Sequence, residues 1–247
     1  METEGEKAPA APPKPPGPDS AFARIVGTFV SPVRTFAAIA ARPTFLAPLV
    51  LWTAMSFLVS ELVLSRTDWR AVVVENAARR EAKMTEAQID QAVETSRRIQ
   101  WVFQLFAAAA PSVIALITAG GLWMGCQAFG WELRFRQAFG VVAHAYLPGV
   151  AAAVALFALL WGRSTIDPQG IDDVLRTSPA FLVDRRADRT LHSLLASLDA
   201  LSFWSMGLMT LGLSSATGAS RGRVAALVLS LWGLYVLGKA GLGIAFS

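Results

Sequence analysis

The sequence has little charge and almost no cysteine. Only 16% of its 247 residues are charged, against about 25% in an ordinary soluble domain, whereas 54% are hydrophobic. The single cysteine, Cys126, lies in an apolar block and excludes an intramolecular disulfide. So many apolar side chains exceed what one soluble core can bury. The composition therefore favours a protein embedded in lipid.

The scarcity of polar chemistry also excludes several classes of function. The two histidines, His144 and His192, have no second ligand at metal spacing, so no metal site is expected. The net charge of +4 comes from dispersed basic residues rather than from one stripe, which argues against nucleic acid as a partner. The string from Gly218 to Gly222 matches G-x-S-x-G, but it lies between two apolar segments and does not follow a strand. We predict no catalytic residue, no cofactor and no enzymatic activity.

What the sequence does contain is a series of long apolar blocks. Each has about 20 residues or more, the length that a helix needs to cross about 30 Å of hydrocarbon. Pro111 and Pro148 fall inside two of them, where a bundle tolerates proline because neighbouring helices satisfy the freed carbonyls. We predict an all-α integral membrane bundle of five transmembrane helices. The expected spans are residues 45–65, 101–129, 137–161, 198–216 and 224–246.

The first span is preceded by two different segments. Residues 1–20 are rich in alanine and proline and predict a disordered tail, which leaves 21–247 as the membrane domain. Between Phe22 and Ala41 the apolar residues have helical spacing, broken at Ser31 and Pro32. We expect two amphipathic helices in the membrane interface, the second capped by Ser31. Packing on the bundle is the alternative, and both can hold together.

Two longer polar loops interrupt the spans. Residues 66–100 predict a helical hairpin outside the membrane, and Thr85 to Gln88 have the pattern of a capping box. Residues 162–197 begin with a turn signal at 167–170 and end in a charged helix around 185–195. These loops are the expected sites of a folded polar surface.

Arginines in the short loops indicate the orientation of the chain. Arg134 and Arg136 lie in one short loop, and Arg221 and Arg223 lie in the other. Basic residues also surround the predicted interfacial helices. By the positive-inside rule, the N-terminus is expected in the cytoplasm and, after five spans, the C-terminus outside.

Several short motifs occur in one order along residues 22–246. They are Ser31-Pro32-Val33-Arg34-Thr35-Phe36, Arg42-Pro43, Ala47-Pro48-Leu49, Ala145-Tyr146-Leu147-Pro148, Leu198-Asp199, Phe203-Trp204 and Gly212-Leu213. This pattern resembles bacterial members of the Yip family of multipass membrane proteins. The resemblance implies a five-helix bundle, a cytoplasmic N-terminus and residence in the inner membrane. Eukaryotic relatives are associated with Rab-type GTPases and vesicle traffic, but the short tail and the hairpin depart from their pattern, so a GTPase role is not carried over.

Four polar residues in or at the edge of the spans are candidate site residues. Glu61 either reaches the outer interface or serves a proton or substrate site, and His144, near Tyr146, either bonds a neighbouring carbonyl or relays protons. A pair between His144 and Glu61 is the sharpest functional hypothesis. Asp199 either caps the fourth span or forms an ion pair with arginines just upstream.

Small residues indicate where helices approach closely. Gly121 and Gly125 form one G-x-x-x-G, which we expect to pack within the chain, although contact between copies stays an alternative. The favoured function is a non-enzymatic membrane scaffold or adaptor, with the bilayer and a membrane or cytoplasmic protein as partners. The alternative is a small transporter or permeation factor that uses Glu61 and His144.

Overall fold

Helices dominate the part of the chain that the structure describes. The computed structural model describes residues 20–168, 170–171, 174–183 and 188–245. Within these ranges there is no strand, and the predicted all-α fold is confirmed. The helices are α1 (Ala21–Val30), α2 (Pro32–Ala41), α3 (Leu46–Ser65), α4 (Trp69–Arg79), α5 (Glu86–Ala128), α6 (Phe135–Ala145), α7 (Leu147–Trp161), α8 (Arg189–Ser197), α9 (Ala200–Thr217) and α10 (Arg221–Ala245), with a 3-10 turn η2 at Pro179–Leu182.

Some features expected from the sequence fall outside the described residues. They are residues 1–19 of the tail, Gln169 in the turn at 167–170, residues 184–187 at the start of the expected charged helix, and the last two residues after α10.

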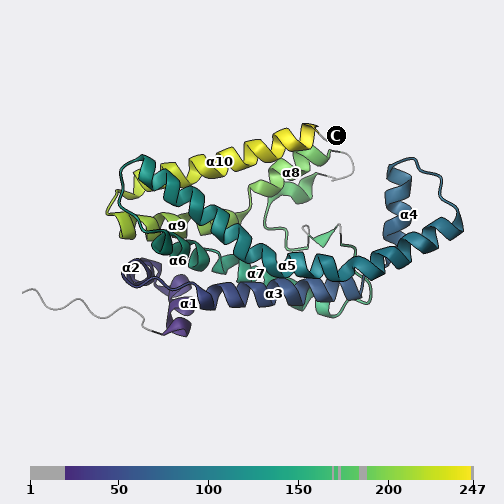
Figure 1. Ribbon diagram of the computed structural model, residues 1–247, viewed down its shortest axis with the longest axis horizontal. Helices are drawn as coiled ribbons and strands as arrows, with labels where there is room; N and C mark the ends of the chain where they lie inside the picture. Colours follow the sequence, from purple (N-terminus) through teal and green to yellow (C-terminus); the bar gives the residue numbers. More distant parts are fainter. Residues whose placement is uncertain (1–19, 169, 172–173, 184–187, 246–247) are drawn as a thin grey trace, which may run out of the picture.

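Four helical stretches are long and apolar enough to cross a membrane: α3, α5, the α6–α7 pair and the part of α10 over Arg221–Gly241. The α8–α9 pair, bent by 42°, adds a fifth if it counts as one span. Figure 1 shows these helices running between two ends of an elongated bundle, with α1 and α2 at one end and the C-terminus at the other. The expected membrane bundle is confirmed, with four to five spans.

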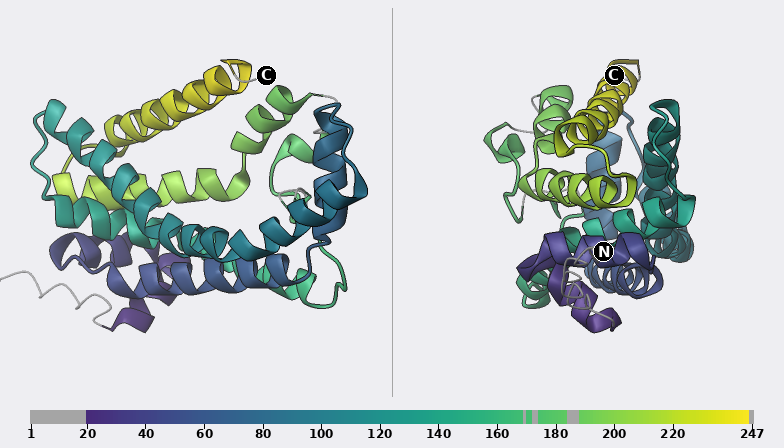
Figure 2. Two further views of the ribbon diagram at one scale, coloured as in Figure 1. Left: turned by 45° about the vertical axis from the view of Figure 1, so that its right-hand side comes forward. Right: turned by 90° about the vertical axis from the view of Figure 1, so that its left-hand side faces the viewer.

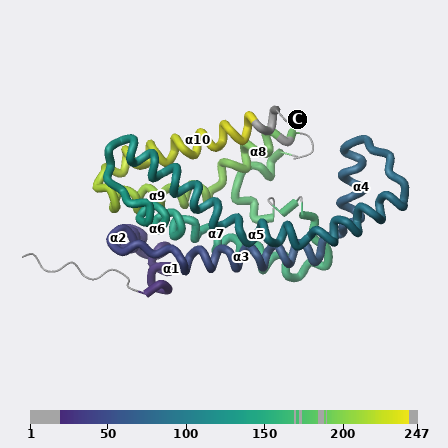
Figure 3. The backbone as a smooth tube through the Cα atoms, in the orientation of Figure 1, coloured from purple at the N-terminus to yellow at the C-terminus, as the bar shows by residue number. Residues whose placement is uncertain are grey.

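Helix α5 differs from its expected form. The sequence separates a hairpin helix from a span near residue 100, whereas α5 runs without a break from Glu86 to Ala128. At about 1.5 Å per residue, its 43 residues extend about 65 Å, roughly twice the hydrocarbon thickness. The helix continues because residues 86–110 contain no glycine or proline, and it also continues past the buried Pro111. The backbone tube in Figure 3 shows α5 reaching from the end of the bundle near α2 to the hairpin with α4.

The third apolar block consists of two helices rather than one. Helix α6 ends and α7 begins at Tyr146, and Pro148 follows in the first turn of α7. Proline fits there because the first N–H groups of a helix have no intrahelical partner. The amide of Gly149 instead bonds the carbonyl of Tyr146 at 3.0 Å.

The main core lies where α2, α6 and α9 meet. Phe36, Ile39, Val141 and Leu213 are completely buried there. Gly212 permits the close approach, because a Cβ at this position would lie 2.5 Å from Val141 and 2.7 Å from Phe36. The end-on view in Figure 2 shows α1 and α2 along one side of the bundle, at the end where Figure 1 labels α6 and α9. The interfacial helices are therefore packed on the bundle as well as placed at its edge.

Candidate functional site

Helix α1 has its polar side toward the protein and its apolar side outward. Phe22 and Val30 are 76% and 74% exposed, and Val26 lies on the same face. Arg24 and Thr28, on the opposite face, are 4% and 0% exposed. Water would not stabilise this arrangement, whereas lipid covers the outward face. The inverted pattern is the local signature of a helix set into a membrane interface.

Polar contacts hold α1 against the entry to α3. The guanidinium of Arg24 donates to the carbonyl of Arg42 at 2.7 Å and to Oγ1 of Thr44 at 2.9 Å. The Thr28 hydroxyl donates to the carbonyl of Arg24 at 2.9 Å. Ser31 stands at the N-cap of α2, but the expected capping bond from its side chain is not formed among the described residues. Its backbone lies outside the extended region that a capping residue usually adopts.

Exposed arginines gather at the end of the bundle that carries α1 and α2. They are Arg34, Arg42, Arg134, Arg136, Arg221 and Arg223. Gln137 joins two of the segments by donating to the carbonyl of Ala40 at 2.9 Å. In the described residues 20–45, 129–137 and 217–224, Glu132 is the one acidic side chain. We call this surface the basic end.

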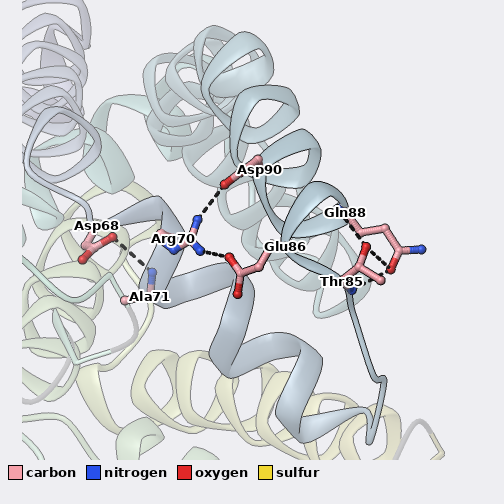
Figure 4. Close-up of polar contacts among 7 residues, drawn as sticks. All are labelled: Asp68, Arg70, Ala71, Thr85, Glu86, Gln88 and Asp90. Atoms are coloured by element: carbon pink, nitrogen blue, oxygen red, sulfur yellow. Dashed lines mark hydrogen bonds and ion pairs between the residues drawn. The ribbon is translucent and has the colours of Figure 1, made fainter.

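The opposite end carries a helical hairpin made of α4 and the first turns of α5. Figure 4 shows Arg70 of α4 pointing at Glu86 and Asp90 of α5, with a 2.6 Å bond to Asp90. The bond to Asp90, followed by that to Glu86, raises the pKa of the Arg70 guanidinium above its ordinary value. Thr85 and Gln88 form the expected capping box at the start of α5, which is confirmed.

Replacing Arg70 with glutamine is expected to loosen α4 from α5 while leaving the membrane bundle folded. Arg70 joins the two helices, so its loss should raise amide hydrogen exchange along α4 several-fold. The matched control is Arg79→Gln, since the ion pair that the described residues give Arg79 is with Glu75, inside α4. Equal exchange in the two variants would contradict the assignment.

A second arginine joins the C-terminal ends of α3 and α7. The guanidinium of Arg66 donates to the carbonyls of Leu160, Trp161 and Arg163, at 3.3, 2.5 and 2.6 Å. It also lies 5.7 Å from the ring centroid of Trp161. A cation at this position satisfies the last carbonyls of α7 and meets the negative end of its dipole.

The structure does not bring Glu61 and His144 together. His144 is 1% exposed, and its Nδ1 lies 2.9 Å from the carbonyl of Gly140. Glu61 is exposed on α3, nine residues beyond Trp52, which is about 13 Å along the helix. The ring of Trp52 itself packs against that of Tyr146, tilted by 40°. No hydrogen bond or ion pair joins Glu61 to His144 in the described part of the chain.

Tyr146 and Asp199 lie in separate polar contacts. The Tyr146 hydroxyl is 2.9 Å from Oγ1 of Thr118, and its ring is 4.7 Å from that of Trp52, so it joins α6 to α5 and α3. Asp199 is the N-cap of α9, and its Oδ2 accepts from the amide of Ser202 at 2.9 Å. The other expected partners of Asp199 are Arg185, Arg186 and Arg189; the first two residues and the side chain of Arg189 lie outside the described part of the chain.

Gly121 and Gly125 face α10 of the same chain. A Cβ at Gly125 would lie 2.6 Å from Leu227, and one at Gly121 would lie 4.0 Å from Leu231. Farther along α10, Lys239 donates to the carbonyl of Ser193 at 3.0 Å and lies 3.4 Å from the Ser197 hydroxyl, so it holds α8. Among the described residues there is no group of three or more histidine, cysteine, aspartate or glutamate side chains that could hold a metal ion.

A comparison with protein families gives a match along nearly the whole helical region. The model of the Yip1 domain matches residues 26–242, from within α1 to the last turns of α10. The chain belongs to the Yip1 domain family. The Yip1 match includes the α4–α5 hairpin and the basic end, and it confirms the family indicated by the sequence motifs. No curated protein and no solved structure matches the chain.

Proposed function

We propose that this Yip1-domain protein is a membrane scaffold or adaptor without enzymatic activity, which presents the α4–α5 hairpin to a protein partner. The continuity of α5 carries the proposal. One helix supplies both a membrane span and one arm of the hairpin, so a bound partner would be held in a fixed relation to the bilayer. Arg70 adds the contact that keeps α4 on α5.

The distribution of charge supports an orientation for this scaffold. Six exposed arginines lie at the basic end, which favours its placement at the cytoplasmic face of the inner membrane. The N-terminus is then cytoplasmic, and the hairpin and the C-terminus are outside. The contacts of Gly121 and Gly125 with α10 support a role for these glycines in packing within one chain.

The permeation alternative has less support from the described contacts. It requires polar groups that share a path, but Glu61 and His144 lie on separate parts of the bundle. His144 also has a backbone partner one turn away, which is the ordinary role of a buried histidine.

A photocrosslinking experiment in cells tests the scaffold. A photoreactive amino acid is placed at Ala87 or Gln91, which are exposed on the hairpin arm of α5, and at the control position Ile117. Ile117 lies in the apolar part of the same helix, and its side chain is 70% exposed. We expect one discrete protein adduct from the hairpin positions and none from Ile117. Absence of that adduct, together with a substrate-dependent flux in proteoliposomes, would contradict the scaffold and favour the permeation alternative.

A further inference from the structure

Two helices at the basic end begin with the same charge pattern. Helix α6 opens with Arg134-Phe135-Arg136, and α10 opens with Arg221-Gly222-Arg223. All four arginines are exposed, and neither helix has an acidic residue in its first turn. The N-terminus of a helix carries a partial positive charge of its own. The positive charge of these arginines is therefore not neutralised by the helices that carry them.

One cation–π contact places Arg223 of α10 against the loop that leads into α6. The guanidinium carbon of Arg223 lies 5.2 Å from the ring centroid of Trp131. Trp131 precedes Arg134 by three residues in the loop between α5 and α6. The two pairs therefore border one loop, in which Glu132 is the single acidic residue.

The same surface continues directly into exposed apolar side chains. Phe129 is 59% exposed and stacks on Trp131 at 5.3 Å between centroids. Met124, five residues earlier and on another face of α5, is 60% exposed, and Phe135 lies between the two arginines of α6 in the sequence. A ligand that fits has an anionic head next to an apolar chain.

From this juxtaposition we propose that Arg134, Arg136, Arg221 and Arg223 bind the phosphate groups of anionic phospholipids, whose acyl chains lie along exposed apolar side chains such as Phe129 and Met124. Guanidinium groups donate paired hydrogen bonds to phosphate oxygens, and anionic lipids attract basic residues beside a span. The aromatic rings mark the depth at which headgroup and hydrocarbon meet. The site lies at the end opposite the hairpin and does not depend on the scaffold proposal.

Lipid binding to the full chain, purified in a neutral detergent, tests the proposal. Phosphatidylglycerol and phosphatidylcholine are titrated separately, and bound lipid is counted by native mass spectrometry. We expect the wild-type chain to prefer phosphatidylglycerol by about tenfold or more. Substituting Arg134, Arg136, Arg221 and Arg223 with glutamine should reduce this preference to near one, and raised salt should weaken it.

The control carries four substitutions at the opposite end, Arg79→Gln, Arg80→Gln, Arg97→Gln and Arg98→Gln, which remove the same charge from exposed positions. It should bind phosphatidylglycerol like the wild type. If the variant of the basic end keeps the preference, or if the control loses it equally, the proposal is wrong. If inorganic phosphate displaces the lipid at equal concentration, the assignment to a membrane lipid is also wrong. Where the fourfold variant does not fold, the double variant Arg221→Gln/Arg223→Gln must show at least a threefold loss, or the proposal fails.

Discussion

Replacing Gly212 with alanine is expected to destabilise the bundle by about 1–3 kcal/mol, because the added methyl group overpacks the core. Its Cβ would lie 2.5 Å from Val141 and 2.7 Å from Phe36. Both neighbours are completely buried, so neither can move aside without disturbing α2 or α6. Unfolding in a mild detergent, followed by circular dichroism, measures the change.

Gly207→Ala provides the matched control on the same helix. Gly207 is exposed on α9, and a Cβ there would meet nothing within 4 Å among the described residues. Alanine also has the higher helix propensity, so this variant should be as stable as the wild type or slightly more stable. Equal losses in the two variants would show that the contact between α9 and α2 is not close in the protein.

Replacing Arg66 with alanine is expected to reduce the stability of the folded bundle by about 2 kcal/mol, because hydrogen bonds from a charged donor are lost at partly exposed carbonyls. Three carbonyls at the end of α7 lose one shared donor, and Trp161 loses its cation. Arg66→Lys should recover part of the loss, since lysine keeps the charge but lacks the planar fork of arginine. Thermal unfolding in detergent ranks the stability of the wild type, Arg66→Lys and Arg66→Ala.

Arg163→Ala is the control for Arg66. Arg163 lies at the same end and is exposed, and it contributes its backbone carbonyl, which the substitution retains. We expect a change of less than about 0.5 kcal/mol, as for most surface substitutions. A loss from Arg163→Ala as large as that from Arg66→Ala would indicate a general effect of charge rather than a specific bond.

The sequence was sufficient for the membrane class, the helical fold and the family. Segment length and apolar content determine whether a helix can cross a bilayer, and both are properties of the sequence alone. The sequence did not predict that α5 is one unbroken helix. The change from charged to apolar residues near Trp101 marks a change of surroundings rather than the end of a helix. The inward direction of Arg24 was not predictable either, since periodicity identifies two faces but not their partners.

The hydrogen bonds from Arg66 to the end of α7 were not predicted from the sequence, for a different reason. Its acceptors are backbone carbonyls 94 to 97 residues away, and every residue has a carbonyl, so the sequence contains no signal for this contact. The same holds for Lys239 and the carbonyl of Ser193. In contrast, the capping box of Thr85 and Gln88 is local and depends on residue type, which is why it could be predicted.

The packing of α2 on α9 also determines when the buried face of α2 can be covered during synthesis. Its buried face, with Phe36, packs on Gly212 of α9, which leaves the ribosome far later. At about 5–20 residues per second, the interval corresponds to roughly 10–35 s. The contacts of Arg24 with Arg42 and Thr44 are local and can form early. Helices α1 and α2 would therefore lie at the membrane surface as a preformed pair until α6 and α9 are synthesised and cover Phe36.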